Sequence, residues 1–127
     1  MMNRTSQILY AYWNEVRGKR IAPRRFEIEP ARIGSILPET FILERSEQGG
    51  YRFRLSGTRI FECFGVEFRG ESFLDLWQGV DRDLVANTLH AVTDQGAVAT
   101  FSFQRAAESG RPATFAAVLL PLVHSCQ

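Results

Sequence analysis

The chain has few of the residues that catalytic and metal sites use. Two cysteines, Cys63 and Cys126, and two histidines, His90 and His124, occur among 127 residues. The cysteines lie far apart without the spacing of metal ligands, which favours reduced thiols over a disulfide framework. The sequence also lacks a nucleophile elbow, a phosphate-binding glycine loop and zinc-ligand spacing. We therefore expect a protein that is not an enzyme and binds no metal.

Long apolar runs and a strong net charge are also absent. No apolar stretch approaches the roughly 18 residues that a membrane helix needs, and the first twenty residues lack the continuous apolar block of a secretory signal. The net charge of +1 gives no overall attraction to nucleic acid or to anionic lipid. We expect one domain in the cytoplasm, with neither nucleic acid nor a membrane among its partners.

Two segments have the apolar spacing of amphipathic helices. The first has Thr5 or Ser6 available as a cap and Gly18 as its end, and the second follows Asp81 as a cap and ends at Gly96. Their apolar faces consist of Ile8, Leu9, Tyr12, Trp13 and Val16 in the first helix and of Leu84, Val85, Thr88, Leu89 and Val92 in the second.

Four segments have strand patterns and form two predicted hairpins. Residues 40–45 and 51–56 flank a connection with two glycines, and the second of these strands alternates strictly. Residues 97–105 alternate as well, whereas residues 113–122 are apolar on both faces, which predicts a strand inside a sheet and covered on both sides. Two antiparallel hairpins around a helical insert predict an α+β domain.

Two long runs carry a resemblance to a known family. YWNEVRGKRIAPRRFEIEPARIGSILPETFILE (12–44) and YRFRLSGTRIFECFGVEFRGESFLDLW (51–77) resemble the single-domain PAS proteins of alphaproteobacteria, the MopJ-type family once catalogued as a domain of unknown function. The likeness covers residues 10–122, including the late VLLPL strand. It implies a PAS-like antiparallel sheet with helices packed on one face, an N-terminal amphipathic helix and linker over residues 1–25, a PAS-like domain over residues 26–127, and a role in signalling. It implies no particular ligand.

The chain departs from the family in its strand count. A PAS sheet has five strands in the spatial order 2-1-5-4-3, and only four are recognisable here, so the last, central strand is missing. Three explanations stay open: the sequence is truncated, the first strand pairs directly with the fourth, or another chain supplies the partner. Because an open central edge exposes a row of unpaired amides, we expect a homodimer.

The expected function is sensing or signalling, through a small ligand, a regulatory protein partner or both. Alternatives are a small α+β enzyme acting on an apolar substrate and a purely structural dimerisation module. A set of apolar side chains either lines a ligand pocket or fills a core, and the sequence does not separate the two. The pocket candidates are Phe53, Leu55, Phe61, Phe64, Leu89, Phe101 and Phe103.

Two further groups are candidates for binding. A cationic stretch matches the phosphates of a nucleotide second messenger, because guanidinium groups pair bidentately with phosphate oxygens; the alternative is a solvated linker. Tyr12 and Trp13 suit either a dimer interface or packing within the domain. The candidate anion-binding residues are Arg17, Lys19, Arg20, Arg24 and Arg25.

No cofactor is expected. Flavin-binding PAS relatives carry an Asn-Cys-Arg-Phe-Leu-Gln run, and the FECFGV sequence around Cys63 departs from it. A single histidine at an arbitrary helical position, such as His90, is weak evidence for haem. An acid–base pair would need carboxylates in a shared cleft, and the four nearby carboxylates alternate with aromatic residues in a way that suits outward-pointing side chains. These carboxylates are Glu62, Glu67, Glu71 and Asp75.

Overall fold

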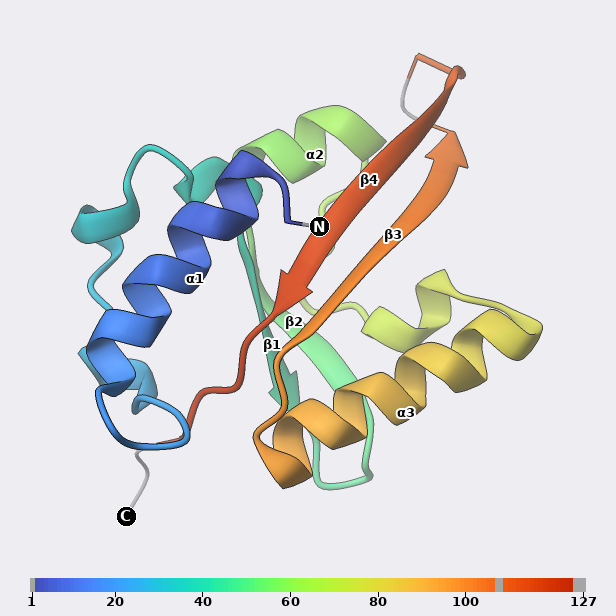
Figure 1. Ribbon diagram of the computed structural model, residues 1–127. Coiled ribbons are helices and arrows are strands. Elements are labelled where there is room, and N and C mark those ends of the chain that lie inside the picture. The colour runs from blue at the N-terminus through green and yellow to red at the C-terminus, as the bar shows by residue number, and fades with distance from the viewer. Residues whose placement is uncertain (1, 107–108, 125–127) are drawn as a thin grey trace.

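In the described part of the chain the main elements follow in the order helix, hairpin, two helices, hairpin (Figure 1). The computed structural model describes residues 2–106 and 109–124, and Cys126 lies outside that range. The predicted mixed α+β fold is confirmed. In chain order the elements are α1 (Arg4–Arg17), the 3-10 turns η1 (Arg25–Glu27), η2 (Pro30–Ile33) and η3 (Leu37–Glu39), β1 (Phe41–Arg45), β2 (Tyr51–Ser56), α2 (Thr58–Phe64), η4 (Phe73–Leu76), α3 (Gly79–Gln95), β3 (Ala99–Ala106) and β4 (Pro112–Leu119).

Both main helices end where predicted but begin earlier. Asn3, in extended backbone, accepts a hydrogen bond from the backbone N–H of Ser6 at 2.8 Å and is the N-cap of α1, so the predicted caps Thr5 and Ser6 are wrong. The N-cap of α3 is Gln78. Asp81 instead lies in the first turn of α3, where a carboxylate interacts favourably with the helix dipole.

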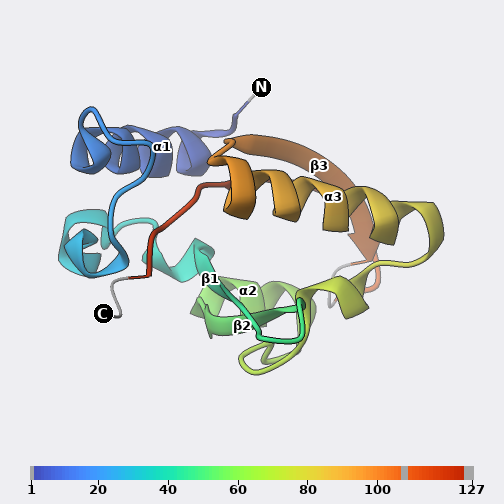
Figure 2. The same cartoon turned by 90° about the horizontal axis from the view of Figure 1, so that it is seen from below.

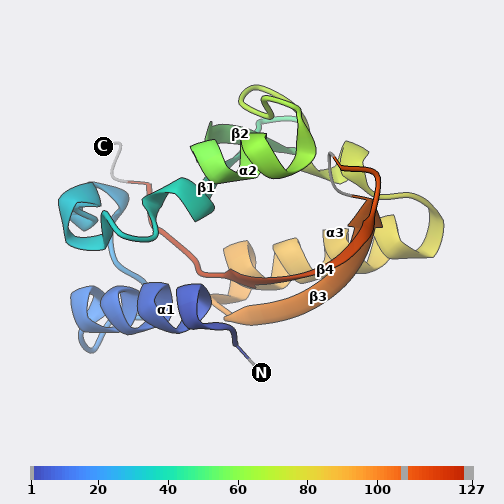
Figure 3. The ribbon, with the colours of Figure 1, turned by 90° about the horizontal axis from the view of Figure 1, so that it is seen from above.

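The two hairpins form two separate sheets. β1 pairs antiparallel with β2, and β3 pairs antiparallel with β4. Within residues 2–106 and 109–124 no strand ladder joins them, so the first strand does not pair directly with the fourth. The views from below and above show the hairpins on opposite sides of the molecule (Figures 2 and 3).

The last strand, β4, is an edge strand and is not covered on both sides as predicted. Its first six residues alternate between exposed and half-buried, and only its last two, Val118 and Leu119, are buried. The prediction failed because an apolar sequence does not specify the neighbour. One edge of β4 pairs with β3, and the other has no strand neighbour among the described residues.

A bulge in the first hairpin changes which side chains face the core. The register of the β1–β2 ladder shifts between Ile42 and Leu43. Tyr51 and Phe53 are buried, but Leu55 is 40% exposed, so the alternation in the sequence holds for only part of β2. An extra residue on one strand re-aims the side chains beyond it.

The main core lies under α3 and between the two hairpins. Phe53 of β2, Phe73 of η4 and Leu89 of α3 are its central buried residues. A second, smaller cluster packs α1 against the turns that follow it, through Tyr12, Ile33 and Ile36. In the main core α3 packs with the hairpins, and in the smaller cluster α1 packs at one end of the molecule (Figure 1).

A close backbone approach occurs at Gly57, between β2 and α2. A Cβ atom at this position would lie 2.2 Å from the carbonyl oxygen of Pro38, because the backbones of η3 and the β2–α2 step nearly touch. We therefore expect Gly57→Ala to lower the free energy of unfolding by about 1–3 kcal/mol, the usual cost of overpacking. Urea unfolding followed by circular dichroism measures it.

Gly50→Ala is the matched control, since a Cβ at Gly50 meets only the side chain of Ser46, at 3.4 Å. Its effect should stay within about 1 kcal/mol of zero. Equal effects of the two substitutions would contradict the assignment of Gly57 as a packing glycine.

Candidate functional site: a cavity between the hairpins

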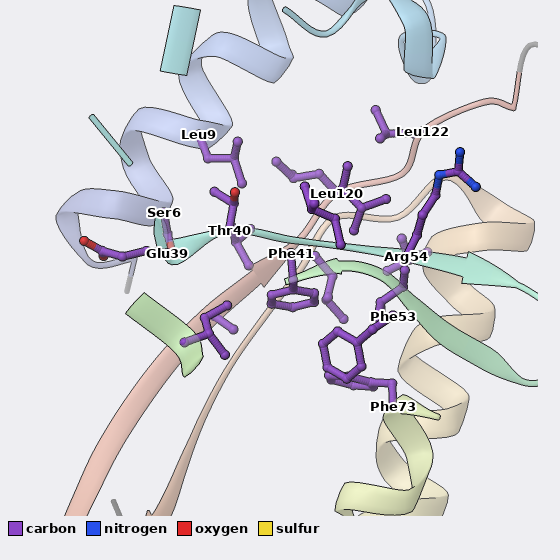
Figure 4. Close-up of a pocket in the computed structure, with 18 of the residues that line it drawn as sticks. Ser6, Leu9, Glu39, Thr40, Phe41, Phe53, Arg54, Phe73, Leu120 and Leu122 are labelled. Atoms are coloured by element: carbon purple, nitrogen blue, oxygen red, sulfur yellow. The ribbon is translucent and has the colours of Figure 1, made fainter. Parts of the chain in front are cut away.

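A cavity of about 1140 Å³ lies between the two hairpins and reaches α1. Its walls are mostly apolar side chains from β1, β2, β4, α3 and the segment after β4. Figure 4 shows the rings of Phe41, Phe53 and Phe73 on one side of β1 and Leu9 and Leu120 on the other. The cavity therefore lies along β1 and borders both faces of that strand.

The apolar candidates from the sequence mostly come together here. Phe53 and Leu89 are buried in the core beside the cavity, and Leu55 is at its margin. Phe61 does not line the cavity and is 47% exposed. The remaining candidates, which also line the cavity, are Phe64, Phe101 and Phe103.

Sequence reasoning missed two walls of the cavity. Every residue from Thr40 to Arg45 and every residue from Thr114 to Leu122 lines it, yet neither run supplied a candidate. The signal in the second run was its apolar character on both faces. That pattern indicated that these residues are buried, but it did not indicate that they line a cavity.

Aromatic rings tie the second hairpin to the helical side of the cavity. The ring of Trp77 lies 5.2 Å from that of Phe103, and Phe103 lies 5.4 Å from Phe115 on the neighbouring strand. Phe115 in turn lies 4.8 Å from Phe64 of α2. Such pairs contribute about 0.5–1.5 kcal/mol each beyond the burial of their area. They hold this wall without backbone pairing to the first hairpin.

The cationic stretch after α1 is largely bonded within the chain. Arg20 donates to both carboxylate oxygens of Glu27, at 2.8 and 3.2 Å, and to the carbonyl of Val16. Arg17 donates to Asn14 and to the carbonyl of Arg20, and its guanidinium lies over the ring of Trp13. The guanidinium groups of these two candidate anion-binding residues therefore bond to other groups of their own chain.

The other members of the cationic stretch are Lys19, Arg24 and Arg25. The backbone N–H of Arg25 donates to the carbonyl of Val123, which places Arg24 and Arg25 beside the segment after β4. Arg25 borders the cavity, and the side chain of Lys19 is exposed.

Tyr12 and Trp13 pack within their own chain. The indole Nε1 of Trp13 donates to the carbonyl of Pro121 at 2.8 Å, and the hydroxyl of Tyr12 accepts from the backbone N–H of Glu29. They are 7% and 4% exposed, respectively. The residues proposed for a dimer interface thus present little surface, and instead they join α1 to the walls of the cavity.

The residues that an acid–base pair would need do not converge. His90 is exposed, with its ring 5.7 Å from that of Tyr51. The four candidate carboxylates, Glu62, Glu67, Glu71 and Asp75, are all exposed as well. The enzyme alternative required a pair of these groups inside the cavity, and this geometry does not provide it.

Cys63 is half-buried at the cavity wall as a free thiol. Within the described part of the chain, no three His, Cys, Asp or Glu side chains lie close enough together to hold a metal ion. None of the helices described here has the length and apolarity that crossing a membrane requires.

Comparison with protein families gives one result. The family model described as "PAS domain" matches residues 1–127, the whole sequence. Neither a curated protein nor a solved structure matches this chain. The match includes α1 and the cationic linker together with the hairpins.

The ion pair of Arg20 with Glu27 leads to a prediction about the pKa of Glu27. The hydrogen bond from Arg20, followed by that from the backbone N–H of Arg24, lowers the pKa of Glu27. A lowered folded-state pKa adds stability above the unfolded pKa, and this stability is lost as the pH falls through the folded pKa. We expect Arg20→Gln to raise the pKa of Glu27, measured by NMR titration of its side-chain carbon.

Lys19→Gln is the control, because it removes a neighbouring positive charge that is not among the causes of the shift. It should leave the titration of Glu27 unchanged. Equal shifts in the two variants would mean that general charge, and not the Arg20 contact, sets the pKa.

Proposed function

Because the chain belongs to the PAS domain family, we propose that it is a non-enzymatic sensory module that binds an apolar occupant in the cavity between its hairpins. The family supports a sensory or signalling role. The cavity itself supports the binding of an occupant. Its volume of about 1140 Å³ slightly exceeds the ~300–1000 Å³ typical of ligand sites.

The chemistry of the walls favours an apolar occupant over an anionic one. Aromatic and aliphatic side chains from both hairpins and from α1 make up most of the lining, and Arg17 and Arg20, two of the five residues that would bind phosphate, are hydrogen-bonded within their own chain. Transfer of apolar groups into such a space is favourable by about 25 cal/mol per Å² of apolar surface removed from water. A nucleotide second messenger therefore fits this site poorly.

The output of the module is a change in association. An occupant in contact with both hairpins alters the strand edges and the packing of α1 that a homodimer or a regulatory protein would meet. Native mass spectrometry of the free and the occupied protein reports this change as a shift in subunit count. A purely structural dimerisation module, by contrast, has no use for a cavity of this size.

A cavity-filling substitution tests the binding site. Phe115 faces the core through its contacts with Phe64 and Phe103, and Ala117, two residues along the same strand, shares that face and lines the cavity. Ala117→Phe should weaken binding of the apolar dye 8-anilinonaphthalene-1-sulfonate on the order of tenfold, equivalent to about 1.4 kcal/mol. Dye fluorescence titration measures the affinity.

Ala113→Phe is the matched control, because Ala113 lies on the same face of β4 but is not part of the cavity lining. It should leave the dye affinity within about twofold of the original protein, a difference of less than 0.5 kcal/mol. The proposal fails if the native, folded protein binds no dye or if both variants bind it with unchanged affinity.

A further inference from the structure

The cavity extends past both apolar clusters of the fold. Its lining includes Phe53 and Leu89 of the main core and Tyr12 of the smaller cluster beside α1. Figure 4 shows Leu9 of α1 and Phe73 of η4 among the lining side chains, on opposite sides of β1. An occupant that fills this space is therefore elongated, with one end near α1 and the other near α3.

Both carboxylates in the lining already have a cationic partner. The charged side chains of the lining include two glutamates, Glu39 and Glu44, and five arginines. Glu39 lies 3.7 Å from the guanidinium of Arg59, and Glu44 lies 3.4 Å from that of Arg54. An anionic group inside the cavity therefore meets no unpaired carboxylate of the described lining.

Arg25 differs from the other arginines of the lining. Arg45 pairs with Asp94 of α3, and Arg105 donates to the carbonyl of Leu76 at 3.0 Å. The Nε of Arg25 is buried without a hydrogen-bond partner, and no carboxylate within residues 2–106 and 109–124 pairs with its guanidinium. An anion stabilises such a partly desolvated cation more strongly than one in full contact with water.

Backbone hydrogen bonds hold Arg25 at a place where the cavity meets solvent. The N–H of Arg25 donates to the carbonyl of Val123, and the N–H of Val123 donates to the carbonyl of Pro23, both at 2.9 Å. The next residue, Phe26, also lines the cavity and is 67% exposed. A charged group beside Arg25 therefore keeps part of its hydration, which lowers the cost of bringing it there.

We infer that the occupant is an amphiphile, an aliphatic chain with one carboxylate, which places the chain in the cavity and the carboxylate against Arg25. This inference rests on the proposed function and specifies the chemical class of the ligand. A guanidinium pairs with both oxygens of a carboxylate through parallel hydrogen bonds. Its single positive charge matches a carboxylate better than a phosphate monoester, which carries about −1.5 to −2. The occupant stays apolar along the rest of its length, as the walls require.

Decanoate and decan-1-ol test the inference, because they have the same chain length and differ in charge. We expect both to bind the full chain in isothermal titration calorimetry. Arg25→Gln should weaken decanoate binding at least about tenfold, or about 1.4 kcal/mol, and leave decanol binding within about twofold. Arg25→Lys keeps the positive charge and should bind decanoate within about fivefold of the original protein, or about 1 kcal/mol.

Arg24→Gln is the matched control. Arg24 is the neighbouring arginine, and it is exposed and not part of the cavity lining. Its substitution should leave the affinity for decanoate within about twofold. Equal losses in Arg24→Gln and Arg25→Gln would mean that the cationic stretch attracts the anion in general, and the assignment to Arg25 would be wrong.

The titration of the bound acid separates a charge contact from a packing role of Arg25. A nearby cation lowers the pKa of a carboxyl group, whereas burial raises it. The pKa of bound decanoic acid, measured by NMR of its labelled carboxyl carbon, should therefore be lower on the original protein than on Arg25→Gln. Equal values overturn the inference. If Arg25→Gln does not fold, a bound pKa on the original protein at or above that of the free acid overturns it.

The remaining outcomes separate this inference from the proposed function. If decanol and the dye bind but decanoate does not, the cavity takes neutral apolar chains, and only the carboxylate is wrong. If Arg25→Gln weakens decanoate and decanol equally, Arg25 has a packing role, and again only the carboxylate is wrong. If the folded protein binds none of the three, both the inference and the proposed function are wrong.

Discussion

A continuous series of aromatic contacts holds the two hairpins in one molecule. The ring of Phe41 on β1 stacks on Phe73 of η4 at 5.9 Å, Phe73 lies 5.9 Å from Trp77, and Trp77 lies 5.2 Å from Phe103 on β3. Backbone pairing does not link the hairpins within the described residues. Side-chain packing therefore holds the two hairpins together, as a shared strand ladder would in a continuous sheet. This role accounts for the many aromatic residues between residues 51 and 77.

The same constraint explains why a large cavity exists beside a well-packed core. A strand ladder fixes neighbouring backbones at about 4.8 Å, whereas ring contacts are satisfied over centroid distances of about 4.5–7 Å. Polar contacts at the rim also come from side chains: Arg45 of β1 pairs with Asp94 of α3, and the hydroxyl of Tyr51 lies 3.2 Å from that of Thr93. Side-chain contacts therefore hold the hairpins together, and no strand ladder joins them within the described residues.

Local sequence patterns predicted the helices and strands well. They did not predict the contacts between segments that are distant in the sequence. The alternation of residues 51–56 gave the limits of β2, and Gly96, with a φ of +71°, ends α3 as expected. Whether the two hairpins pair with each other depends on contacts between distant segments, which no local pattern encodes. The exposure of Leu55 has a similar origin, since it follows from a bulge in the ladder with β1. The apolar character of the cavity wall was visible in the sequence, but whether those residues fill a core or surround a space depends on how far apart the hairpins stand.

The position of α1 links the state of the cavity to the outside of the molecule. Trp13 bonds to Pro121 in the segment after β4, and Tyr12 bonds to Glu29 in the turns that lead into β1. One helix thus contacts the chain on both sides of the space. Both side chains are buried and hydrogen-bonded, so direct contacts join α1 to the segment after β4 and to the turns that precede β1.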